Sequence, residues 1–442
     1  MYSIIVAVEE AHGIGYKGYI PWKCTEDLQY FKNTTNGHIV IMGGDTFRSL
    51  KKPLVNRLNI VISKKLATTE EYLVFDNPLA AVRYCDNIKD KKIFVIGGSS
   101  IYNWFLNNKL VQRIYITHIN ESHACDKFFM WDKKEFCLLE EKQLSSNATL
   151  RIFKYINTGE NNVLALMHNA LFGNKKEDRT KIGTSSLFGN QLKFDLRNNT
   201  FPLLTSKKIW LPGVFEELML FLRGQTDSTI LEEKKINIWK KNTSREFLDK
   251  CGLKHLPVGD MGPSYGFLFR HFGAKYINCK SDYKDQGYDQ LANVIKLLKT
   301  DPNSRRMIIS LWDPNALDHC PLPPCLYNYQ FYAHNNTLSC MMTQRSSDFV
   351  VAGGWNIATG SLLTILIANI VGMEPHELIW NIGDLHIYNN LIEEANINTA
   401  RPTTVFPKLY VKKRDNIEDF EFSDLELLNY KPEPAIKTIM NA

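Results

Sequence analysis

The chain has 442 residues, which as a soft prior corresponds to about two to three domains. Its residues are 44% hydrophobic and 12% aromatic, which is ample for large buried cores. Lysine and arginine number 53 against 47 aspartates and glutamates, and the net charge of +6 is dispersed along the chain. The charge is therefore too mild and too dispersed to argue for a nucleic-acid partner, although it suits anionic small substrates.

We expect neither a targeting signal nor a membrane span. The apolar run Ser3–Val8 is too short for a signal sequence and lacks a basic flank. The most apolar stretch, Ile357–Val371, is interrupted by polar residues and falls short of a membrane span, so we expect a buried core helix. The nine cysteines form no CxxC pair. This usage predicts a cytoplasmic protein with free thiols and no structural metal.

Up to about Ile156, short β-branched runs alternate with helical stretches. Strands are expected at Ile4–Val8, Ile39–Met42, Leu58–Ser63, Lys92–Ile96 and Arg113–Thr117, and helices at Glu26–Asn33 and Ile101–Leu106. Thr25 is the expected N-cap of the first helix. Such alternation predicts a mainly parallel sheet. The runs Glu135–Gln143 and Thr149–Ile156 predict a closing antiparallel hairpin.

The polar segment Asn157–Asn162 is the best domain boundary. We expect a first domain over residues 1–157, a short linker over 158–162 and a second domain over 163–442. Beyond the boundary, helices are expected at Val214–Arg223, Tyr288–Leu298 and Asn356–Val371, and strands at Arg306–Trp312, Tyr327–Ala333 and Leu338–Gln344. The fold class is therefore an α/β domain followed by an α+β domain with one large core.

Asp27 is the first candidate functional residue. At helical spacing Asp27 and Phe31 share one face, with Leu28 beside them. One interpretation is an ordinary first-turn acid favoured by the helix dipole. The other is a carboxylate in an apolar pocket, which can hydrogen-bond an aminopyrimidine edge and assist protonation of a substrate. The pattern of the helix alone leaves both open.

A glycine pair, Gly97-Gly98, follows an expected strand and precedes a helix. Glycines at such a turn let backbone N–H groups approach a pyrophosphate at the helix N-terminus. The segment does not have the GxGxxG pattern, and a Gly-Gly pair is usually only a turn.

Taken together, residues 2–156 resemble dihydrofolate reductase. The matching segments are Ile5-Val6-Ala7, Gly13-Ile14-Gly15, Ile20-Pro21-Trp22, Asp27 to Phe31, Ile41-Met42-Gly43, Arg57 and Ile96-Gly97-Gly98. The resemblance implies that Asp27 binds the pterin with help from Thr117. It also implies a folate pocket lined by Ile5, Phe31 and Leu54, and an arginine, Arg57, that grips the glutamate tail. The implied NADPH site consists of Ala7, Ile14, Thr46, Ser63, Lys64, Ile96, Gly97, Gly98, Ser99 and Tyr102.

One position departs from this family. Many members have a basic residue after the glycine of the Met-Gly turn, where it meets the 2′-phosphate of the cofactor. Here the segment is Gly43-Gly44-Asp45, and Asp45 should repel that phosphate. Ser63, Lys64 and Lys65 follow the next strand and can supply the charge, so NADPH remains the expected cofactor.

Cys325 is the candidate nucleophile of the second domain. It follows Pro323-Pro324 and precedes a strand, so the prolines hold its thiol at the end of an element. Most cysteines are inert core residues, and a reactive one needs nearby cations that favour its thiolate. The candidate cations are Arg179, Arg305, Arg306 and Arg345. Clustered arginines also suit a phosphate monoester, although a single arginine is more commonly a surface ion pair.

The motifs around these residues resemble thymidylate synthase over about residues 162–442. They are Asp178-Arg179-Thr180, Phe201 to Thr205, Glu216-Glu217-Leu218, Gly262 to Gly266, Ser304-Arg305-Arg306, Pro323-Pro324-Cys325, Gln344-Arg345-Ser346, Asn356-Ile357-Ala358, Gly383-Asp384, His386-Ile387-Tyr388 and Arg401-Pro402. The whole chain thus resembles the fused dihydrofolate reductase–thymidylate synthase family. The resemblance implies methylation of dUMP to dTMP with 5,10-methylenetetrahydrofolate. The dihydrofolate released would then be reduced with NADPH.

The resemblance also implies a role for each residue. Cys325 would attack the pyrimidine, Glu217 would organise proton transfer, and Arg345, Tyr265 and Asp384 would complete the catalytic set. Arg179, Ser346, Asn356, His386 and Tyr388 would bind dUMP, while Asp348 and Trp239 would hold the folate. Arg305 and Arg306 would reach the phosphate across a twofold interface. The protein would then be a homodimer through its C-terminal domain, with no membrane and no required nucleic acid.

Several positions depart from the synthase pattern: Lys181-Ile182, Leu326, Gly353-Gly354-Trp355 and Thr359-Gly360. The triplet 353–355 stands where Leu-Pro-Phe is usual, and Thr359-Gly360 replaces Ser-Tyr. The chemical residues survive, so we expect altered affinity or lid geometry rather than lost chemistry. Two alternatives stay open, namely a pyrimidine nucleotide hydroxymethylase on the same scaffold and a degenerate synthase serving as a dimeric scaffold or RNA-binding protein.

Overall fold

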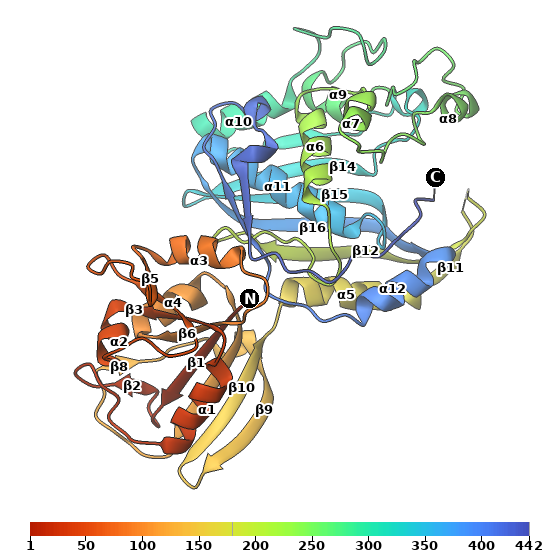
Figure 1. Cartoon of the computed structure of the whole chain (residues 1–442). Coiled ribbons are helices and arrows are strands. Elements are labelled where there is room, and N and C mark those ends of the chain that lie inside the picture. Colours follow the sequence, from red (N-terminus) through yellow and green to blue (C-terminus); the bar gives the residue numbers. More distant parts are fainter. Residues whose placement is uncertain (179, 442) are drawn as a thin grey trace. The chain divides into compact units, whose positions relative to one another are not determined.

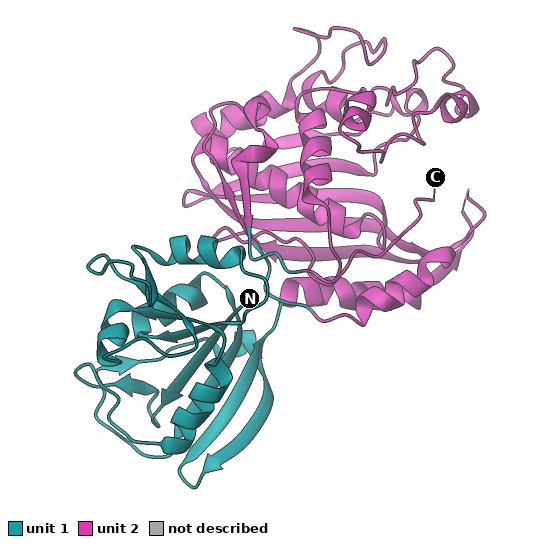
Figure 2. Cartoon of the chain, in the orientation of Figure 1, with its two compact units in different colours: residues 1–157, 403–407, 428–431 teal, residues 158–402, 408–427, 432–442 magenta. Residues whose placement is uncertain are grey.

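The structure is a computed structural model that describes residues 1–178 and 180–441. The chain divides into two compact units (Figure 2). Unit 1 comprises residues 1–157, 403–407 and 428–431, and unit 2 comprises residues 158–402, 408–427 and 432–442. Residues 158–162, predicted as a linker, form the start of a helix, α5 (Thr158–Leu171). Each unit is described by itself below.

Unit 1 is a sheet of eight strands with helices between them (Figure 1). Its elements are β1 (Tyr2–Val8), β2 (Gly13–Gly15), α1 (Thr25–Thr35), β3 (Ile39–Gly43), α2 (Gly44–Ser49), β4 (Leu58–Ile62), β5 (Tyr72–Phe75), α3 (Pro78–Asp86), β6 (Ile93–Gly97), α4 (Ser99–Asn107), β7 (Val111–Ile119), β8 (Lys127–Phe128), a 3-10 turn (Lys133–Glu135), β9 (Phe136–Ser145) and β10 (Ala148–Tyr155). β2 and β8 pair outside the main sheet.

The strand order of the main sheet is β5-β4-β3-β6-β1-β7-β10-β9. The pairs from β5 to β7 are parallel, whereas β10 runs antiparallel to both β7 and β9. The predicted mainly parallel sheet with a closing hairpin is therefore confirmed. The predicted N-cap Thr25 is wrong, because Thr25 already lies in α1 and the extended residue before it is Cys24, which makes no side-chain cap hydrogen bond.

Two segments from the C-terminal region complete unit 1, which the sequence pattern did not indicate. The backbone N–H of Val405 donates to the buried amide of Gln112 at 2.8 Å, and the side chain of Asn157 donates to the carbonyl of Thr404 at 2.7 Å. The N–H of Asn429 donates to Asp86 at 2.8 Å. Hydrogen bonds between residues so distant in sequence have no local signature.

Unit 2 is built on a six-stranded sheet. Its elements are α5, β11 (Asn174–Lys176), β12 (Thr184–Asp195), α6 (Leu211–Leu222), α7 (Thr229–Glu233), α8 (Arg245–Lys250), α9 (Tyr265–Arg270), α10 (Gln290–Thr300), β13 (Ile308–Ser310), β14 (Leu326–His334), β15 (Thr337–Asp348), α11 (Gly353–Val371), β16 (Glu374–Tyr388), α12 (Ile392–Thr399), β17 (Lys408–Val411) and β18 (Leu425–Leu428), with 3-10 turns at Leu317–His319, Asn389–Leu391, Ile417–Asp419 and Phe422–Asp424. The sheet order is β11-β12-β16-β15-β14-β13, and only β15 and β16 pair in parallel.

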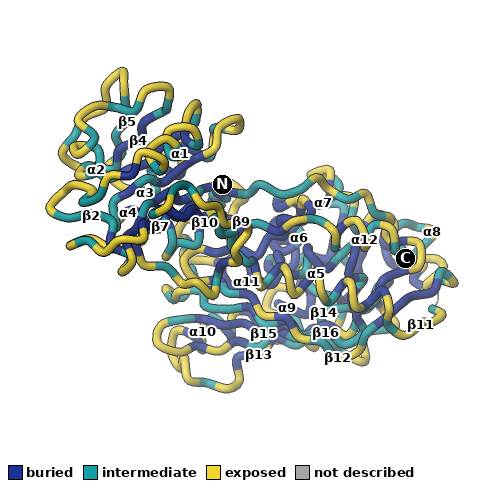
Figure 3. The backbone as a smooth tube through the Cα atoms, turned by 90° about the horizontal axis from the view of Figure 1, so that it is seen from below, coloured by how far each residue is buried: buried dark blue, intermediate teal, exposed yellow. Residues whose placement is uncertain are grey.

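Helix α11 is the core helix of unit 2 and packs on β15, β16 and α6. It begins at Gly353, earlier than predicted, and its 19 residues make it long and apolar enough to cross a membrane by length and composition. The expectation that this stretch falls short of a span is therefore wrong. Its most apolar window is 72% buried inside unit 2, as is typical of a core helix. In both units the buried residues lie mainly in the central strands and helices, whereas exposed residues are concentrated in the connecting turns (Figure 3).

Candidate active sites

Asp27 is the carboxylate around which the unit 1 site is arranged. It lies partly buried in the first turn of α1 and accepts a hydrogen bond from the hydroxyl of buried Thr117 on β7. Burial raises the pKa of Asp27 above its ordinary value, and the Thr117 hydrogen bond opposes this shift. Burial raises the pKa of the nearby Tyr102 hydroxyl, and the charge of Asp27 raises it further. This geometry favours the carboxylate-pocket interpretation over a simple first-turn acid.

Apolar side chains and one arginine extend this site. Ile5 belongs to the buried cluster of the sheet, and Phe31, Leu54 and Ile96 pack against it. The hydroxyl of Tyr102 donates to the carbonyl of Ile5 at 3.0 Å. The structure therefore brings the predicted folate-pocket residues together.

Arg57 is held in place by the chain around it. Its guanidinium donates to the hydroxyl of Thr35 at 2.9 Å and to the carbonyls of Val55 and Lys32 at 2.8 Å each. Three of five N–H donors are thus committed within the protein. A carboxylate can accept the other two as a fork.

The residues predicted to hold the dinucleotide meet at the N-termini of α2 and α4. A Cβ atom on Gly97 or Gly98 would lie 3.3 or 3.4 Å from the hydroxyl of Thr46. Gly97 also has a φ of 129°, which side chains rarely tolerate. Ser99 is the first residue of α4. The bare backbone therefore forms a cradle that suits a pyrophosphate.

The charge near Gly44 comes from a residue that the sequence analysis missed. Arg48 forms an ion pair with Asp45 one turn along α2, and its Nη1 lies 3.6 Å from where a Cβ of Gly44 would be. The hydroxyl of Ser63 lies 3.1 Å from the same point. Lys64 is exposed beyond Ser63. Arg48 therefore offsets the negative charge of Asp45.

The remaining predicted cofactor residues lie along β1 and β2. Ala7 on β1 is the register partner of Thr117 on β7. Ile14 is in β2, which pairs with β8.

The thiol of Cys325 is the centre of the unit 2 site. Nη2 of Arg345 and Oγ of Ser346 each lie 3.9 Å from the sulfur. The backbone N–H of Cys325 donates to the hydroxyl of Tyr265 at 2.9 Å, and that of Arg345 donates to the Cys325 carbonyl at 2.9 Å. The guanidinium of Arg345 also donates to the carbonyls of Pro323 and Pro324. The prolines thus fix the cation beside the thiol.

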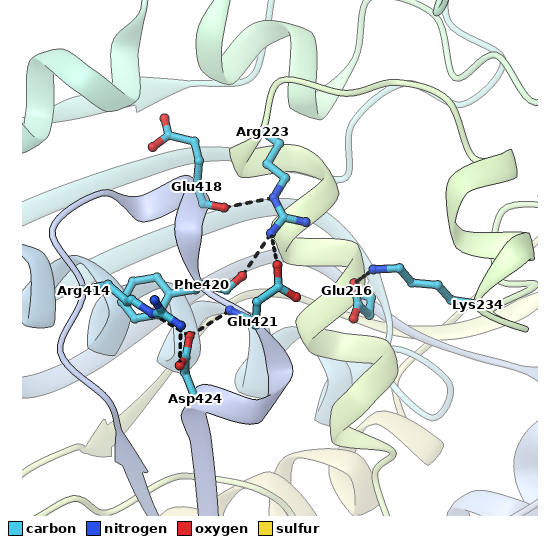
Figure 4. Close-up of polar contacts among 8 residues, drawn as sticks. All are labelled: Glu216, Arg223, Lys234, Arg414, Glu418, Phe420, Glu421 and Asp424. Atoms are coloured by element: carbon cyan, nitrogen blue, oxygen red, sulfur yellow. Dashed lines mark hydrogen bonds and ion pairs between the residues drawn. The ribbon is translucent and has the colours of Figure 1, made fainter.

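Glu217 and its neighbour Glu216 lie on α6 and bind different partners. Glu216 pairs with Lys234 at 2.6 Å (Figure 4). Glu217 instead accepts the indole N–H of Trp239 at 2.8 Å and that of Trp355 at 2.6 Å. Burial raises the pKa of Glu217, and the two indole hydrogen bonds oppose that shift. Trp355 was not predicted as a site residue, although its triplet was noted as unusual.

The C-terminal end of α6 is fixed by the segment that follows β17. The guanidinium of Arg223 donates to the carbonyls of Glu418 and Phe420 at 3.1 and 3.0 Å, and Arg414 pairs with Asp424 nearby (Figure 4). These bonds hold the helix that presents Glu217. The chain from residue 414 to 424 therefore supports the site through α6.

Asn356 and Gln344 place two amides near the thiol. The side chain of Asn356 donates to that of Gln344 at 3.2 Å, and Gln344 is buried on β15. Leu326 is the register partner of Gln344, so the departure at Leu326 lies on the strand beside this pair. Gly360, at the Thr359-Gly360 change, faces the core, and a Cβ there would lie 2.6 Å from the sulfur of Met342.

Asp348, His386 and Asp384 gather on β15 and β16. Asp348 is the register partner of His386, and burial raises its pKa while His386 and Lys207 oppose the shift. Asp384 pairs with Lys176 at 2.9 Å and lies 3.5 Å from His386. Lys207, a residue not predicted, is buried, and burial lowers its pKa to about 8. Its ammonium donates to the carbonyl of Val350.

The other predicted phosphate and ribose residues are more scattered. Tyr388 hydrogen-bonds the carboxylate of Asp178. Arg305 and Arg306 are exposed just before β13. The prediction for Arg179 falls outside the described residues. In the ranges 1–178 and 180–441, no three histidine, cysteine or acidic side chains are grouped to hold a metal.

Comparison with known proteins finds relatives of both units. The thymidylate synthase family matches residues 161–442, and the dihydrofolate reductase family matches residues 1–158. A bifunctional dihydrofolate reductase-thymidylate synthase of Paramecium tetraurelia is 39% identical over 458 residues, which cover 99% of this chain and 98% of the relative. Proteins of the same description from Leishmania major and Daucus carota are 38% and 36% identical, and each alignment covers 99% of this chain and 95% of the relative.

Proposed function

The chain belongs to the family of bifunctional dihydrofolate reductase–thymidylate synthases, and from that membership we propose which residues carry each of its two reactions. It methylates dUMP to dTMP with 5,10-methylenetetrahydrofolate, and it reduces the dihydrofolate released to tetrahydrofolate with NADPH. The single observation that best supports the residue assignment is the Cys325 thiol between Arg345 and Ser346, 3.9 Å from each.

In the synthase reaction, Cys325 attacks the pyrimidine ring as a thiolate, which the adjacent guanidinium of Arg345 favours. The attack creates an enolate that accepts the one-carbon unit. Glu217 moves protons through water, while Tyr265 fixes the backbone of Cys325 through its hydroxyl. Asp384, held by Lys176, keeps His386 oriented. These residues then surround one reacting carbon.

Substrate binding in unit 2 divides between phosphate, ribose, base and folate. Arg179, Arg345 and Ser346 bind the phosphate of dUMP, and His386 with Tyr388 holds the ribose. Asn356, whose amide is oriented by Gln344, meets the uracil edge. Asp348 and Trp239 hold the pterin of the folate.

In the reductase reaction, Asp27 holds the pterin and supports its protonation, with Thr117 orienting the carboxylate. Ile5, Phe31 and Leu54 exclude water from the ring, and Arg57 offers its remaining N–H groups to the glutamate tail. NADPH supplies the hydride when bound. The cradle of Thr46, Gly97, Gly98 and Ser99 suits its pyrophosphate, and Tyr102 fixes the strand beneath through the carbonyl of Ile5. Ala7, Ile14, Ser63, Lys64 and Ile96 complete the proposed cofactor site.

A direct assay tests both reactions. Purified protein is given dUMP and methylenetetrahydrofolate, with and without NADPH, and dTMP and tetrahydrofolate are measured by mass spectrometry. We expect dTMP in both cases and tetrahydrofolate only with NADPH. A hydroxymethyl product from dUMP would instead favour the hydroxymethylase. A folded protein that forms no covalent complex with 5-fluoro-dUMP and the folate would favour the scaffold. No observation presently favours either alternative.

We also propose that the protein is a homodimer through unit 2. A depression of about 690 Å³ is lined by residues including Phe188, Trp312 and Arg345, and Phe188 is 82% exposed. A second copy of the chain would cover this apolar surface. Exposed Arg305 and Arg306 would then reach the dUMP phosphate of the partner.

Light scattering of purified protein tests the dimer. We expect Phe188→Asp to give monomers, because it buries a charge at the interface. Phe172→Asp is the matched control, since Phe172 is 78% exposed but does not line the depression. A monomeric unmodified protein would contradict the proposal.

We propose a cytoplasmic location. We also propose that neither reaction needs a membrane or a nucleic acid. Support comes from the nine cysteines, all described and all free thiols. Cell fractionation tests the location, and recovery of the protein from an organelle or membrane fraction would contradict it.

A further inference from the structure

Trp355 occupies the position where the synthase family usually has phenylalanine, and the structure gives its indole a specific partner. The ring nitrogen lies 2.6 Å from Oε2 of Glu217, while that of Trp239 lies 2.8 Å from Oε1. Each oxygen of the carboxylate therefore accepts one indole N–H. An indole N–H can only donate, so these contacts suit an ionised carboxylate.

Two glycines make room for this arrangement. A Cβ on Gly213 would lie 2.6 Å from the far edge of the Trp355 ring, and a Cβ on Gly354 would lie 2.8 Å from side-chain atoms of Leu204 and Ile209. Gly354 thus lets the start of α11 approach the segment before α6, and Gly213 receives the indole. The departures at Gly354 and Trp355 are therefore structurally linked, because the close approach at Gly354 helps to place the Trp355 ring.

We propose that Trp355 is a positioning residue for thymidylate synthesis, which together with Trp239 holds the carboxylate of Glu217 in one orientation and favours its ionised form. This inference rests on the proposed role of Glu217. Two rigid rings on different elements, α11 and the segment after α7, fix both oxygens. The carboxylate then keeps its remaining lone pairs for ordered water.

The two indoles are the side chains whose hydrogen bonds favour the ionised form of Glu217 against the effect of burial. The titratable neighbours Tyr265 on α9 and Tyr329 on β14 are neutral, because burial raises the pKa of each. Charged groups on the elements around α6 pair among themselves: Lys234 with Glu216, Lys240 with Glu232, Arg223 with Glu421, Arg270 with Asp289 and Glu418, and Arg414 with Asp424. Burial opposes ionisation of Glu217, and the two indoles favour it.

The test is the pH profile of kcat/KM for dUMP in Trp355→Phe. This variant keeps an aromatic ring and removes the N–H. One limb of this pH profile should report the ionisation of Glu217. It is first identified as the limb that is lost in Glu217→Gln. We expect this limb to move to higher pH by about 1 to 2 units, the size expected when one hydrogen bond to a charged group is lost. Trp239→Phe should move it in the same direction, and the double variant should move it further.

Trp210→Phe is the matched control. Trp210 also packs against Gly213, whereas the indoles that donate to Glu217 are those of Trp239 and Trp355, so replacing Trp210 should leave the limb in place. A uniform loss of activity at every pH in Trp355→Phe, with an unmoved limb, would assign Trp355 a purely structural role and overturn the inference. Should Trp355→Phe fold poorly, 3-benzothienylalanine at position 355 removes the N–H at constant shape and gives the same comparison.

One further measurement separates this inference from the proposed function. The covalent complex with 5-fluoro-dUMP and methylenetetrahydrofolate depends on Cys325 and should form in Trp355→Phe. If the unmodified protein forms neither this complex nor dTMP, the proposed function fails. If it forms both while the Trp355→Phe profile is unshifted, only the role of Trp355 fails.

Discussion

Asp27 in unit 1 and Glu217 in unit 2 are both carboxylates withdrawn from water, yet the protein bonds them differently. Asp27 accepts a hydrogen bond from one hydroxyl, that of Thr117. Glu217 accepts two indole N–H groups, one on each oxygen. A hydroxyl can rotate and also accept, whereas an indole N–H is fixed and only donates. This difference fits the roles proposed above, in which Asp27 meets a substrate edge and Glu217 moves protons through water.

The two sites also share a cost. Burial raises the pKa of both carboxylates, so each destabilises its unit once ionised. Below the pKa of the unfolded state the carboxyl is protonated in both states, and the unit has its full stability. As pH rises through the pKa of the folded state, the buried group ionises and that stability is lost. The comparison therefore makes predictions about activity and about stability, of which the largest concern activity.

Glu217→Gln should lower dTMP formation about 100- to 10,000-fold, the range for loss of acid–base assistance. An amide cannot relay protons and also brings an N–H against an indole N–H. Dihydrofolate reduction, measured separately with added dihydrofolate, should be unchanged. A loss below tenfold would show that Glu217 has no proton-transfer role.

Asp27→Asn should lower dihydrofolate reduction about 100- to 1,000-fold and leave dTMP formation intact. The amide keeps the contact to Thr117 but cannot carry the charge that the pterin needs. The measurement is NADPH oxidation with dihydrofolate over a range of pH. Equal losses in both reactions would mean that the substitution damages folding, not unit 1 chemistry.

Arg48→Ala should weaken NADPH binding about 3- to 10-fold without weakening NADH binding, because an exposed charge contributes modestly. Arg48 lies beside Gly44 and Ser63, where the 2′-phosphate is expected. Affinities are measured by isothermal titration of each dinucleotide. Asp45→Asn is the converse variant and should tighten NADPH binding. Parallel changes for both dinucleotides would exclude a role in phosphate recognition.

The smallest expected effects are on thermal stability, and they should have opposite signs. At pH 7, Asp27→Asn should raise the melting temperature of unit 1 by about 1–3 °C, since it removes a buried charge. Below the unfolded pKa of about 4 this gain should vanish. Glu217→Gln should lower the melting temperature of unit 2 by about 2–4 °C, because one amide hydrogen then opposes an indole N–H. Calorimetry at pH 7 and below pH 4 measures both melting temperatures. Changes of the same sign in the two variants at pH 7 would contradict the contrast between the two carboxylates.

Local pattern was sufficient for much of unit 1. Its strands and helices are short, alternate regularly and are rich in β-branched residues, so most were placed within a few residues. The strands β12 and β16 of unit 2 were missed, because polar residues such as Asn190, Asn381 and Asp384 interrupt their apolar runs. Pairing on both sides holds these strands extended despite their sequence.

The sequence by itself determined the family and the order of the two units, and it predicted the reacting groups, because ordered motifs such as Pro323-Pro324-Cys325 can be read without a fold. Only the tertiary structure decided which groups hold them. Trp355 and Glu217 are 138 residues apart, and their hydrogen bond exists because α11 and α6 pack together. Likewise, residues 403–407 and 428–431 join unit 1 through contacts with no local periodicity. Periodicity reports which face of an element is buried, and it carries no information on what that face will meet.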